Sequence, residues 1–285
     1  MVATVLLVGC GKIGTGLGLQ LSRAGHRCFG LKRHLNQLPE AIQGIAADVT
    51  DPVSLEGLPQ HHYLVFSLVP AAYSAEGYQQ AYVEGLRNLL QALREQQLCP
   101  KRIFFVSSAA VYHQRDGSWV DESSPTEPTG FNGQAMLDAE QLLADSEFIG
   151  TSVRFSGIYG AGRERILNWV RQGVTALPEP CQYGNRIHQQ DCIGVLRFLI
   201  EQDQAGQSLA PIYLASDPNP APYHEVLDWL RQRLAVEVAP QPEDFSQKLR
   251  SGSKRCSSKQ LQALGYQFQY PDYRAGFEAM IAAAD

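Results

Sequence analysis

The chain has 285 residues, of which 44% are hydrophobic and 19% are charged, and its formal net charge at pH 7 is -5. This composition is that of a globular protein with enough apolar residues for a sizeable core. The negative charge and the lack of a basic stripe in the sequence argue against nucleic acid as a partner. No apolar run approaches membrane-spanning length, so no membrane partner is predicted, and no leader segment precedes the first expected strand. We therefore expect a soluble, cytoplasmic protein.

The cysteines and histidines of the sequence do not have the spacing of a metal site. Six cysteines are scattered without any C-x-x-C pair, and no two histidines are spaced as H-x-x-x-H. His61 and His62 are adjacent, so their side chains would point apart in a strand. The sequence predicts reduced thiols, no disulfide framework and no metal.

The N-terminal stretch has the pattern of a strand, a glycine-rich turn, a helix and a second strand. Residues 5–8 form a short unbroken apolar run, as expected of a strand buried on both faces of a parallel sheet. Gly9, Gly11 and Gly14 then give G-x-G-x-x-G. The first glycine allows a tight turn, the second lets a pyrophosphate approach the backbone, and the third lets the helix pack closely on the strand. Free N–H groups at the start of the helix would face the phosphates, so this unit predicts dinucleotide binding.

The residues that follow the second expected strand, 27–31, indicate which dinucleotide binds. An acidic residue there would accept hydrogen bonds from a ribose 2′-hydroxyl and repel a 2′-phosphate. The sequence has Lys32 and Arg33 instead, and a guanidinium can stack on adenine and bind the phosphate through two bonds. Lys12, inside the glycine loop, can add a further positive charge. We expect NADP, with NAD as the second choice; the alternative is that Lys32 and Arg33 are ordinary surface charges.

Strands and helices continue to alternate along the chain. Residues 44–48 form an expected strand ending at Asp48, which is placed to hold the adenine amino group; alternatively, Asp48 with Thr50 and Asp51 caps a short helix. This alternation predicts an α/β fold with a doubly wound parallel sheet. The later expected strands are 63–67, 102–107, 151–155 and 211–215, and the later expected helices are 77–97, 136–144 and 191–202.

Two stretches suggest where a second part of the chain begins. Residues 116–130 are polar and contain proline, as in a long functional loop, and the glycine-rich residues 157–162 turn the chain outward. We expect residues 1–160, completed by 187–216, to form an NADP-binding Rossmann domain. The expected smaller C-terminal lobe, which would cap the substrate, consists of residues 161–186 and 217–285.

Several motifs resemble one family of enzymes. FFVSSAAVY at 104–112, followed by VDESSP at 120–125, is similar to the extended short-chain dehydrogenases, the NAD-dependent epimerase/dehydratase group. The stretches VEGLRNLL at 83–90, RFSGIYG at 154–160 and NRIH at 185–188 resemble the same family, in the family's order. The family usually spaces its glycines as G-x-x-G-x-x-G, so this chain resembles an atypical branch.

The resemblance implies a catalytic serine and a Tyr-x-x-x-Lys pair, in which the lysine and the positive cofactor ring lower the tyrosine pKa for proton transfer. Ser108 matches the family serine. Counting back from Glu140 in LDAE, the tyrosine position is Asn132 and the lysine position is Met136. No tyrosine of the sequence is followed four residues later by lysine. The usual acid–base pair is therefore missing.

The substrate side of the resemblance rests on the NRIH stretch. There the family's arginine often holds the anionic part of the substrate, which implies this role for Arg186, and alternation would place His188 on the same face. It is equally open that Arg186 forms a surface ion pair and that His188 is a hydrogen-bonded structural residue. Tyr112 is expected near the substrate, packing under the nicotinamide. The catalytic candidates are Ser108, Asn132 and His188, with His188 the first candidate for proton donor.

These observations predict an NADP-binding, epimerase/dehydratase-like oxidoreductase that acts on a small polar or anionic substrate. The retained Ser108 and NRIH stretch favour an enzyme, whereas the missing acid–base pair favours a non-catalytic NADP(H)-binding sensor or scaffold. The sequence has no G-x-S-x-G elbow of a serine hydrolase. The resemblance also implies a homodimer through the helices containing 86–93 and 136–143. The expected cofactor-binding residues are Gly9, Gly11, Lys12, Ile13, Gly14, Lys32, Arg33, Asp48, Val49 and Ser107.

Overall fold

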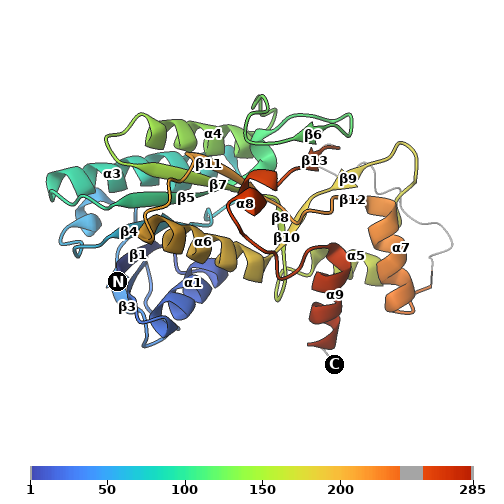
Figure 1. Cartoon of the computed structure of the whole chain (residues 1–285), viewed down its shortest axis with the longest axis horizontal. Coiled ribbons are helices and arrows are strands. Elements are labelled where there is room, and N and C mark those ends of the chain that lie inside the picture. The colour runs from blue at the N-terminus through green and yellow to red at the C-terminus, as the bar shows by residue number, and fades with distance from the viewer. Residues whose placement is uncertain (1, 238–252, 284–285) are drawn as a thin grey trace. The chain divides into compact units, whose positions relative to one another are not determined.

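The computed structural model describes residues 2–237 and 253–283 of the chain. Among these residues, seven strands form a parallel sheet in the order β11-β7-β5-β4-β1-β2-β3 (Figure 1). The central strand β1 pairs in parallel with β2 on one side and with β4 on the other. The strands of this sheet are β1 (Thr4–Val8), β2 (Arg27–Lys32), β3 (Gln43–Ala46), β4 (Tyr63–Phe66), β5 (Arg102–Ser108), β7 (Gly150–Phe155) and β11 (Ile212–Ala215).

Helices cover both faces of the sheet. Figure 1 shows α3 and α4 on one face and α1 and α6 on the other. α1 and α6 approach closely, since a Cβ atom on Gly16 would lie 2.4 Å from a methyl group of Ile193. The predicted doubly wound parallel sheet is confirmed. The elements around it are α1 (Lys12–Arg23), α2 (Ala75–Tyr78), α3 (Gly85–Glu95), α4 (Phe131–Ala144), α6 (Gln189–Gln204) and the short 3₁₀ turns η1 (Pro52–Leu55) and η3 (Ala109–Val111).

The chain divides into two compact units, each built from three segments. The first unit consists of Met1–Val111, Thr126–Arg154 and Ile193–Tyr213, and the second of Tyr112–Pro125, Phe155–Cys192 and Leu214–Asp285. The second unit therefore includes 112–125 and 155–160, which the sequence analysis assigns to the Rossmann domain. It also takes 187–192 and 214–216, at the ends of the segment expected to complete that domain.

Pairing within the second unit explains this division. β8 (Gly157–Tyr159) pairs in parallel with β10 (Arg186–His188), and β6 (Trp119–Val120) pairs in parallel with β13 (Arg255–Cys256). Its apolar core contains Tyr159, Leu167, Val226 and Phe277, each at most 4% exposed. The remaining elements are α5 (Arg165–Arg171), β9 (Tyr183–Gly184), β12 (Ala221–Pro222), α7 (Tyr223–Arg233), α8 (Lys259–Ala263) and α9 (Tyr273–Ala282).

The long helix expected over residues 77–97 is present, from Ala75 to Glu95, but it is not regular. Between α2 and α3, it contains a π-helical segment, η2 (Gln79–Glu84), which the sequence did not predict. The wider π turn lets three consecutive side chains, Ala81, Tyr82 and Val83, all be buried, which the regular α period does not favour. α3 then begins at Gly85, where a Cβ atom would lie 2.6 Å from Val49.

Candidate functional site

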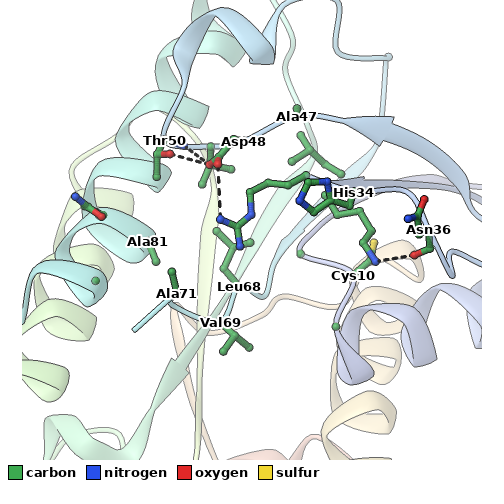
Figure 2. Close-up of a pocket in the computed structure, with 18 of the residues that line it drawn as sticks. Cys10, His34, Asn36, Ala47, Asp48, Thr50, Leu68, Val69, Ala71 and Ala81 are labelled. Atoms are coloured by element: carbon green, nitrogen blue, oxygen red, sulfur yellow. Dashed lines mark hydrogen bonds and ion pairs between the residues drawn. The ribbon is translucent and has the colours of Figure 1, made fainter. Parts of the chain in front are cut away.

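A cavity of about 490 Å³ lies in the first unit at the carboxyl ends of β1 and β2 (Figure 2). Its wall is formed by the glycine loop, by residues 31–34 at the end of β2, by 47–50 after β3, by residues of the segment after β4, and by η2. Ligands of open α/β sheets bind outside the carboxyl ends of the strands, which makes this cavity the candidate cofactor site.

The backbone of the glycine loop has the shape that a dinucleotide requires. Gly9 has φ +97°, and a Cβ atom there would lie 2.6 Å from the carbonyl oxygen of Ser67. A Cβ atom on Gly14 would lie 2.1 Å from the Gly9 carbonyl oxygen, so α1 packs on the loop too closely for any side chain. At Gly11, by contrast, a Cβ atom would meet nothing within 4 Å. The loop is tight where it touches the protein and open at the expected phosphate position.

The start of α1 is also suited to an anion. Gly11 is its N-cap, no side chain caps the helix, and the first turn holds no acidic residue. Main-chain N–H groups at such a helix start attract negative charge. Lys12 is exposed at this end of the helix but does not line the cavity, and Ile13 is 8% exposed. These residues fit a pyrophosphate group.

Two basic residues border the same cavity. Lys32 Nζ donates a hydrogen bond to the main-chain oxygen of Asn36 at 3.4 Å. The Arg33 side chain is 62% exposed, and its Nη1 lies 4.0 Å from Oδ2 of Asp48. Both side chains can therefore turn toward an anionic ligand without breaking a buried contact.

Asp48 lines the same cavity (Figure 2), two residues after the end of β3, the strand that pairs with β2. Its Oδ1 accepts hydrogen bonds from the main-chain N–H of Thr50 at 3.0 Å and from the Thr50 hydroxyl at 2.8 Å. Partial burial by itself raises the pKa of Asp48, but the Thr50 hydrogen bonds and the charge of Arg33 outweigh it, so the pKa lies below its ordinary value. Asp48 thus caps its turn and also lines the cavity, next to the buried Val49. The short helix η1 is capped by Asp51, which accepts from the N–H of Val53 at 3.2 Å.

Ser107 belongs to a buried polar network that sequence reasoning missed. Its hydroxyl donates to Oε1 of Glu140 at 2.5 Å, and Arg154 donates to Oε2 of the same carboxylate at 2.6 Å. All three side chains are at most 6% exposed. The network ties α4 to β5 and β7, and Ser107 does not line the cavity. Because the hydrogen-bonded residues are 14 to 33 positions apart in sequence, no local sequence pattern predicts this network.

Ser108 and Asn132 lie on elements of the first unit that contact each other. Ser108 Oγ accepts a hydrogen bond from the N–H of Ala110 at 3.1 Å, which fixes the turn after β5. The first turn of α4, where Asn132 lies, packs against η3 so closely that a Cβ atom on Gly133 would be 2.3 Å from the Ala110 oxygen. Met136 is buried one turn further along α4, at 5% exposure, and brings no charge.

Tyr112 lies in the second unit and is 3% exposed. Its hydroxyl donates to the main-chain oxygen of Asp121 at 2.8 Å, and its carbonyl oxygen accepts from Nζ of Lys254 at 3.1 Å. The hydroxyl is therefore used to hold the loop that follows β5.

Arg186 is a buried residue of the second unit, at 2% exposure, so the structure contradicts the alternative that it forms a surface ion pair. Its Nη1 donates to the Gly184 oxygen at 3.1 Å, and its guanidinium lies 5.0 Å from the ring centre of Tyr223. Nε and Nη2 have no hydrogen-bond partner among the described residues. These two atoms form one edge of the guanidinium, the edge that binds a carboxylate or phosphate through two bonds.

His188, on the same strand, is 5% exposed and packs against Tyr270, with ring centres 4.0 Å apart, and against Tyr159 at 5.2 Å. Its Nδ1 accepts from the N–H of Gln190 at 3.3 Å, which requires that nitrogen to be unprotonated. Burial lowers the pKa of His188. The geometry is that of the hydrogen-bonded structural histidine that the sequence left as one alternative.

The described part of the chain holds no group of three or more His, Cys, Asp or Glu side chains placed to bind a metal ion. All six cysteines are free thiols. Over residues 2–237 and 253–283, no helix has the length and apolar character to cross a membrane.

Comparison with known proteins places the chain in a family. The model of the NAD dependent epimerase/dehydratase family matches residues 5–205. A solved structure from Methylobacillus flagellatus, assigned to the NAD-dependent epimerase/dehydratase type, is 35% identical, with a TM-score of 0.82 and coverage of 100% of this chain and 99% of the other.

More distant matches differ in activity. A Streptomyces protein named 3-diazoavenalumate denitrifying reductase is 24% identical over 95% of this chain and 98% of its own length. UDP-glucuronic acid 4-epimerase from Bacillus cereus, solved with NAD, shares the fold at 16% identity, with a TM-score of 0.78 and coverage of 98% and 97%. With the family model spanning most of the sheet and its flanking helices, the chain belongs to the NAD-dependent epimerase/dehydratase family.

Proposed function

We propose that this protein is an NADP(H)-dependent oxidoreductase acting on a small polar or anionic substrate. The observation that carries the proposal is the open space at Gly11, at the uncapped start of α1, beside a cavity bordered by Lys32 and Arg33. The name of the Streptomyces relative, a reductase that matches along nearly its whole length, supports reduction as the reaction type.

Charge at the cavity supports NADP over NAD. Lys32 and Arg33 stand where NAD-specific members of such folds carry an acidic residue. Asp48 supplies one negative charge against these two positive ones, and the exposed Arg33 is free to swing toward a 2′-phosphate. The net positive charge of this wall favours the phosphorylated ribose.

The chain's own residues can position a substrate but supply a poor acid. When bound, the nicotinamide supplies or accepts a hydride. Ser108 and Asn132 can donate hydrogen bonds to a substrate oxygen and hold it in place, yet a serine hydroxyl is only weakly acidic and an amide does not titrate. General acid catalysis typically contributes about 10²–10⁴-fold, and we expect roughly that much rate to be missing.

Two measurements test this proposal. Titration calorimetry should show NADPH binding at least about tenfold more tightly than NADH, and NADPH absorbance should fall slowly with at least one member of a panel of carbonyl compounds. Failure to bind either dinucleotide contradicts the proposal. Tight NADPH binding without turnover of any compound would favour the alternative of a sensor or scaffold, for which the missing Tyr-x-x-x-Lys pair is the specific observation.

A further inference from the structure

Three aromatic rings stand together at the surface of the first unit. The ring centre of Tyr73 lies 5.6 Å from that of Tyr78 and 5.1 Å from that of Phe131, and Tyr78 and Phe131 are 5.5 Å apart. All three pairs are edge-to-face. Tyr73 is 58% exposed and Phe131 is 37% exposed, so this ring cluster of Tyr73, Tyr78 and Phe131 presents apolar surface to solvent.

The cluster is anchored to the core from one side. Tyr82, 7% exposed, packs against Tyr78 with ring centres 5.3 Å apart and against Phe105 at 6.4 Å. Its hydroxyl donates to the main-chain oxygen of Leu68 at 3.1 Å. The inner ring thus holds the outer rings in place, and the outer rings leave surface uncovered for a partner.

The ring cluster is adjacent to residues of the cofactor cavity and to a candidate catalytic residue. Ala71 and Gly77, on either side of Tyr73 in sequence, both line the cavity. Phe131 directly precedes Asn132, and α4 packs against α2 and η2. A molecule resting on these rings would therefore contact both the segment that lines the cavity and the first turn of α4.

The segment that leads to Tyr73 is uncharged. Residues 68–74, between β4 and α2, read LVPAAYS, and the nearest charged residue along the chain is Glu76, in the first turn of α2. Val69 in this segment is 69% exposed and lines the cavity. A sugar requires many hydrogen-bonding groups around it, whereas such a wall suits a flat apolar ring, which stacks on aromatic side chains in offset or edge-to-face geometry.

We propose that the ring cluster is one wall of a substrate subsite for a planar aromatic carbonyl compound. This inference rests on the proposed function and narrows its substrate class: the carbonyl is the small polar group, and the flat ring attached to it lies on Tyr73 and Phe131.

A matched pair of ketones isolates the contribution of planarity. Acetophenone and cyclohexyl methyl ketone differ only in whether the six-membered ring is aromatic. Binding of both ketones can be measured without any turnover. Their dissociation constants are measured by saturation-transfer NMR on the full chain loaded with NADP⁺. We expect acetophenone to bind about tenfold more tightly, equivalent to about 1.4 kcal/mol.

Variants then assign the preference to the rings. Tyr73→Leu and Phe131→Leu should each reduce the preference to about threefold or less, whereas Tyr73→Phe, which retains a ring, should preserve it. Trp119→Leu removes a 52% exposed aromatic side chain of the second unit and serves as the control, with the preference unchanged.

The proposal is overturned if the wild type shows no preference, if the preference survives both leucine variants, or if methyl β-glucoside binds more tightly than acetophenone. An NADPH affinity that falls together with the ketone preference would assign the rings to the cofactor and equally overturn it. A retained ring preference with no NADPH-dependent turnover of any compound supports the subsite and contradicts the proposed function alone.

Discussion

Arg33 is an exposed side chain that we propose selects the cofactor. Among the described residues, the guanidinium has one ion-pair contact, a 4.0 Å approach to Asp48, which contributes little to stability in water. Its charge is therefore available to a ligand. Removing it has a double effect, because Asp48 would then face the cavity without its positive neighbour and would repel a 2′-phosphate.

We expect Arg33→Ala to weaken NADPH binding about tenfold or more and to leave NADH binding nearly unchanged. A charge-assisted contact of this kind contributes on the order of 1.5–3 kcal/mol. Titration calorimetry with both dinucleotides measures the difference. Arg27→Ala is the matched control, since Arg27 is exposed at the opposite end of β2 and should not affect the preference. Equal affinity of the wild type for NADPH and NADH would contradict the assignment.

Two neighbouring serines at the end of β5 have different surroundings and should respond differently to alanine. Ser108→Ala should lower kcat/KM for any substrate roughly 2–10-fold, the effect of one hydrogen bond. Ser107→Ala should instead lower the melting temperature, because it removes a donor from the buried carboxylate of Glu140, at a cost of about 1–3 kcal/mol. Steady-state kinetics and thermal melts of both variants separate the two roles. Rapid turnover that Ser108→Ala leaves unchanged would show that Ser108 does not contact the substrate.

His188 provides the corresponding test by pH. Burial lowers the pKa of His188. If the protonated histidine is the acid, the rate should therefore decrease with rising pH at a pKa that lies below the ordinary 6.5. If His188 gives the proton, His188→Gln should remove that decrease. Identical profiles for the variant and the wild type would leave His188 with the structural role that its contacts with Tyr159 and Tyr270 describe.

At the scale of elements, two glycines of the G-x-G-x-x-G motif are present for different reasons. Gly14 is needed by the protein itself, because any side chain there collides with the Gly9 oxygen. Gly11 is not, since the space around it is empty. Gly14 is therefore required by the fold, whereas the space at Gly11 is left for the proposed phosphate contact.

Gly11→Val should abolish NADPH binding while the melting temperature changes by only a few degrees. Gly14→Ala should lower the melting temperature markedly even without cofactor, since overpacking typically costs about 1–3 kcal/mol. Circular dichroism melts and NADPH titration of the two variants provide the comparison. A folded Gly11→Val protein that binds NADPH normally would show that Gly11 does not face the phosphates.

Local sequence patterns predicted the strands and helices that have a regular pattern of buried apolar residues. The apolar run before Gly9 becomes β1, whose last four residues are fully buried, and the following strand–helix–strand unit forms as expected. The π segment η2 and the pairing of β6 with β13 were not predictable. The π segment depends on a wider helical turn, which the spacing of apolar residues did not indicate. The strand pairing joins residues 119–120 to 255–256, which are too far apart in sequence for a local pattern to predict.

The same limit applies to the site. Lys32 and Arg33 could be proposed from the sequence as cofactor contacts, because the expected position of such residues is set by their distance from the glycine motif. The bond between Ser107 and Glu140, and the contacts of Tyr73 with Phe131, depend on tertiary packing instead. Sequence reasoning therefore identified the residues expected at the cofactor but not the buried network or the aromatic rings.

For the whole molecule, the buried His61 is one group whose contribution to stability is lost in acid. His61 is 7% exposed; its Nδ1 lies 2.7 Å from the Pro59 oxygen, and its Nε2 has no hydrogen-bond partner among the described residues. Burial lowers the pKa of His61 below the ordinary 6.5. The folded state then binds fewer protons than the unfolded state, so this contribution to stability is present above pH 6.5 and is lost as the pH falls through the folded pKa.

The buried Asp217, whose pKa burial raises to about 8, acts in the opposite direction over this interval, so the prediction concerns the difference between two proteins. Between pH 7 and pH 5 we expect the free energy of unfolding to fall more in the wild type than in His61→Gln, by about 1.4 kcal/mol for each unit of lowered pKa. Urea unfolding at the two pH values measures it. Comparison at pH 7.5, where His61 is neutral in both states, isolates the loss of packing in the variant. An equal fall in both proteins would show that His61 is not a source of acid sensitivity.

The three-segment construction of the first unit has a consequence for synthesis of the protein. A ribosome releases Met1–Val111 and Thr126–Arg154 long before Ile193–Tyr213, which carries the start of β11. Until that last segment emerges, β7 is the edge of the growing sheet and exposes unpaired N–H and C=O groups to other chains. A chain stopped before residue 193 would keep the glycine loop but also this open edge, so we expect such an N-terminal fragment to aggregate.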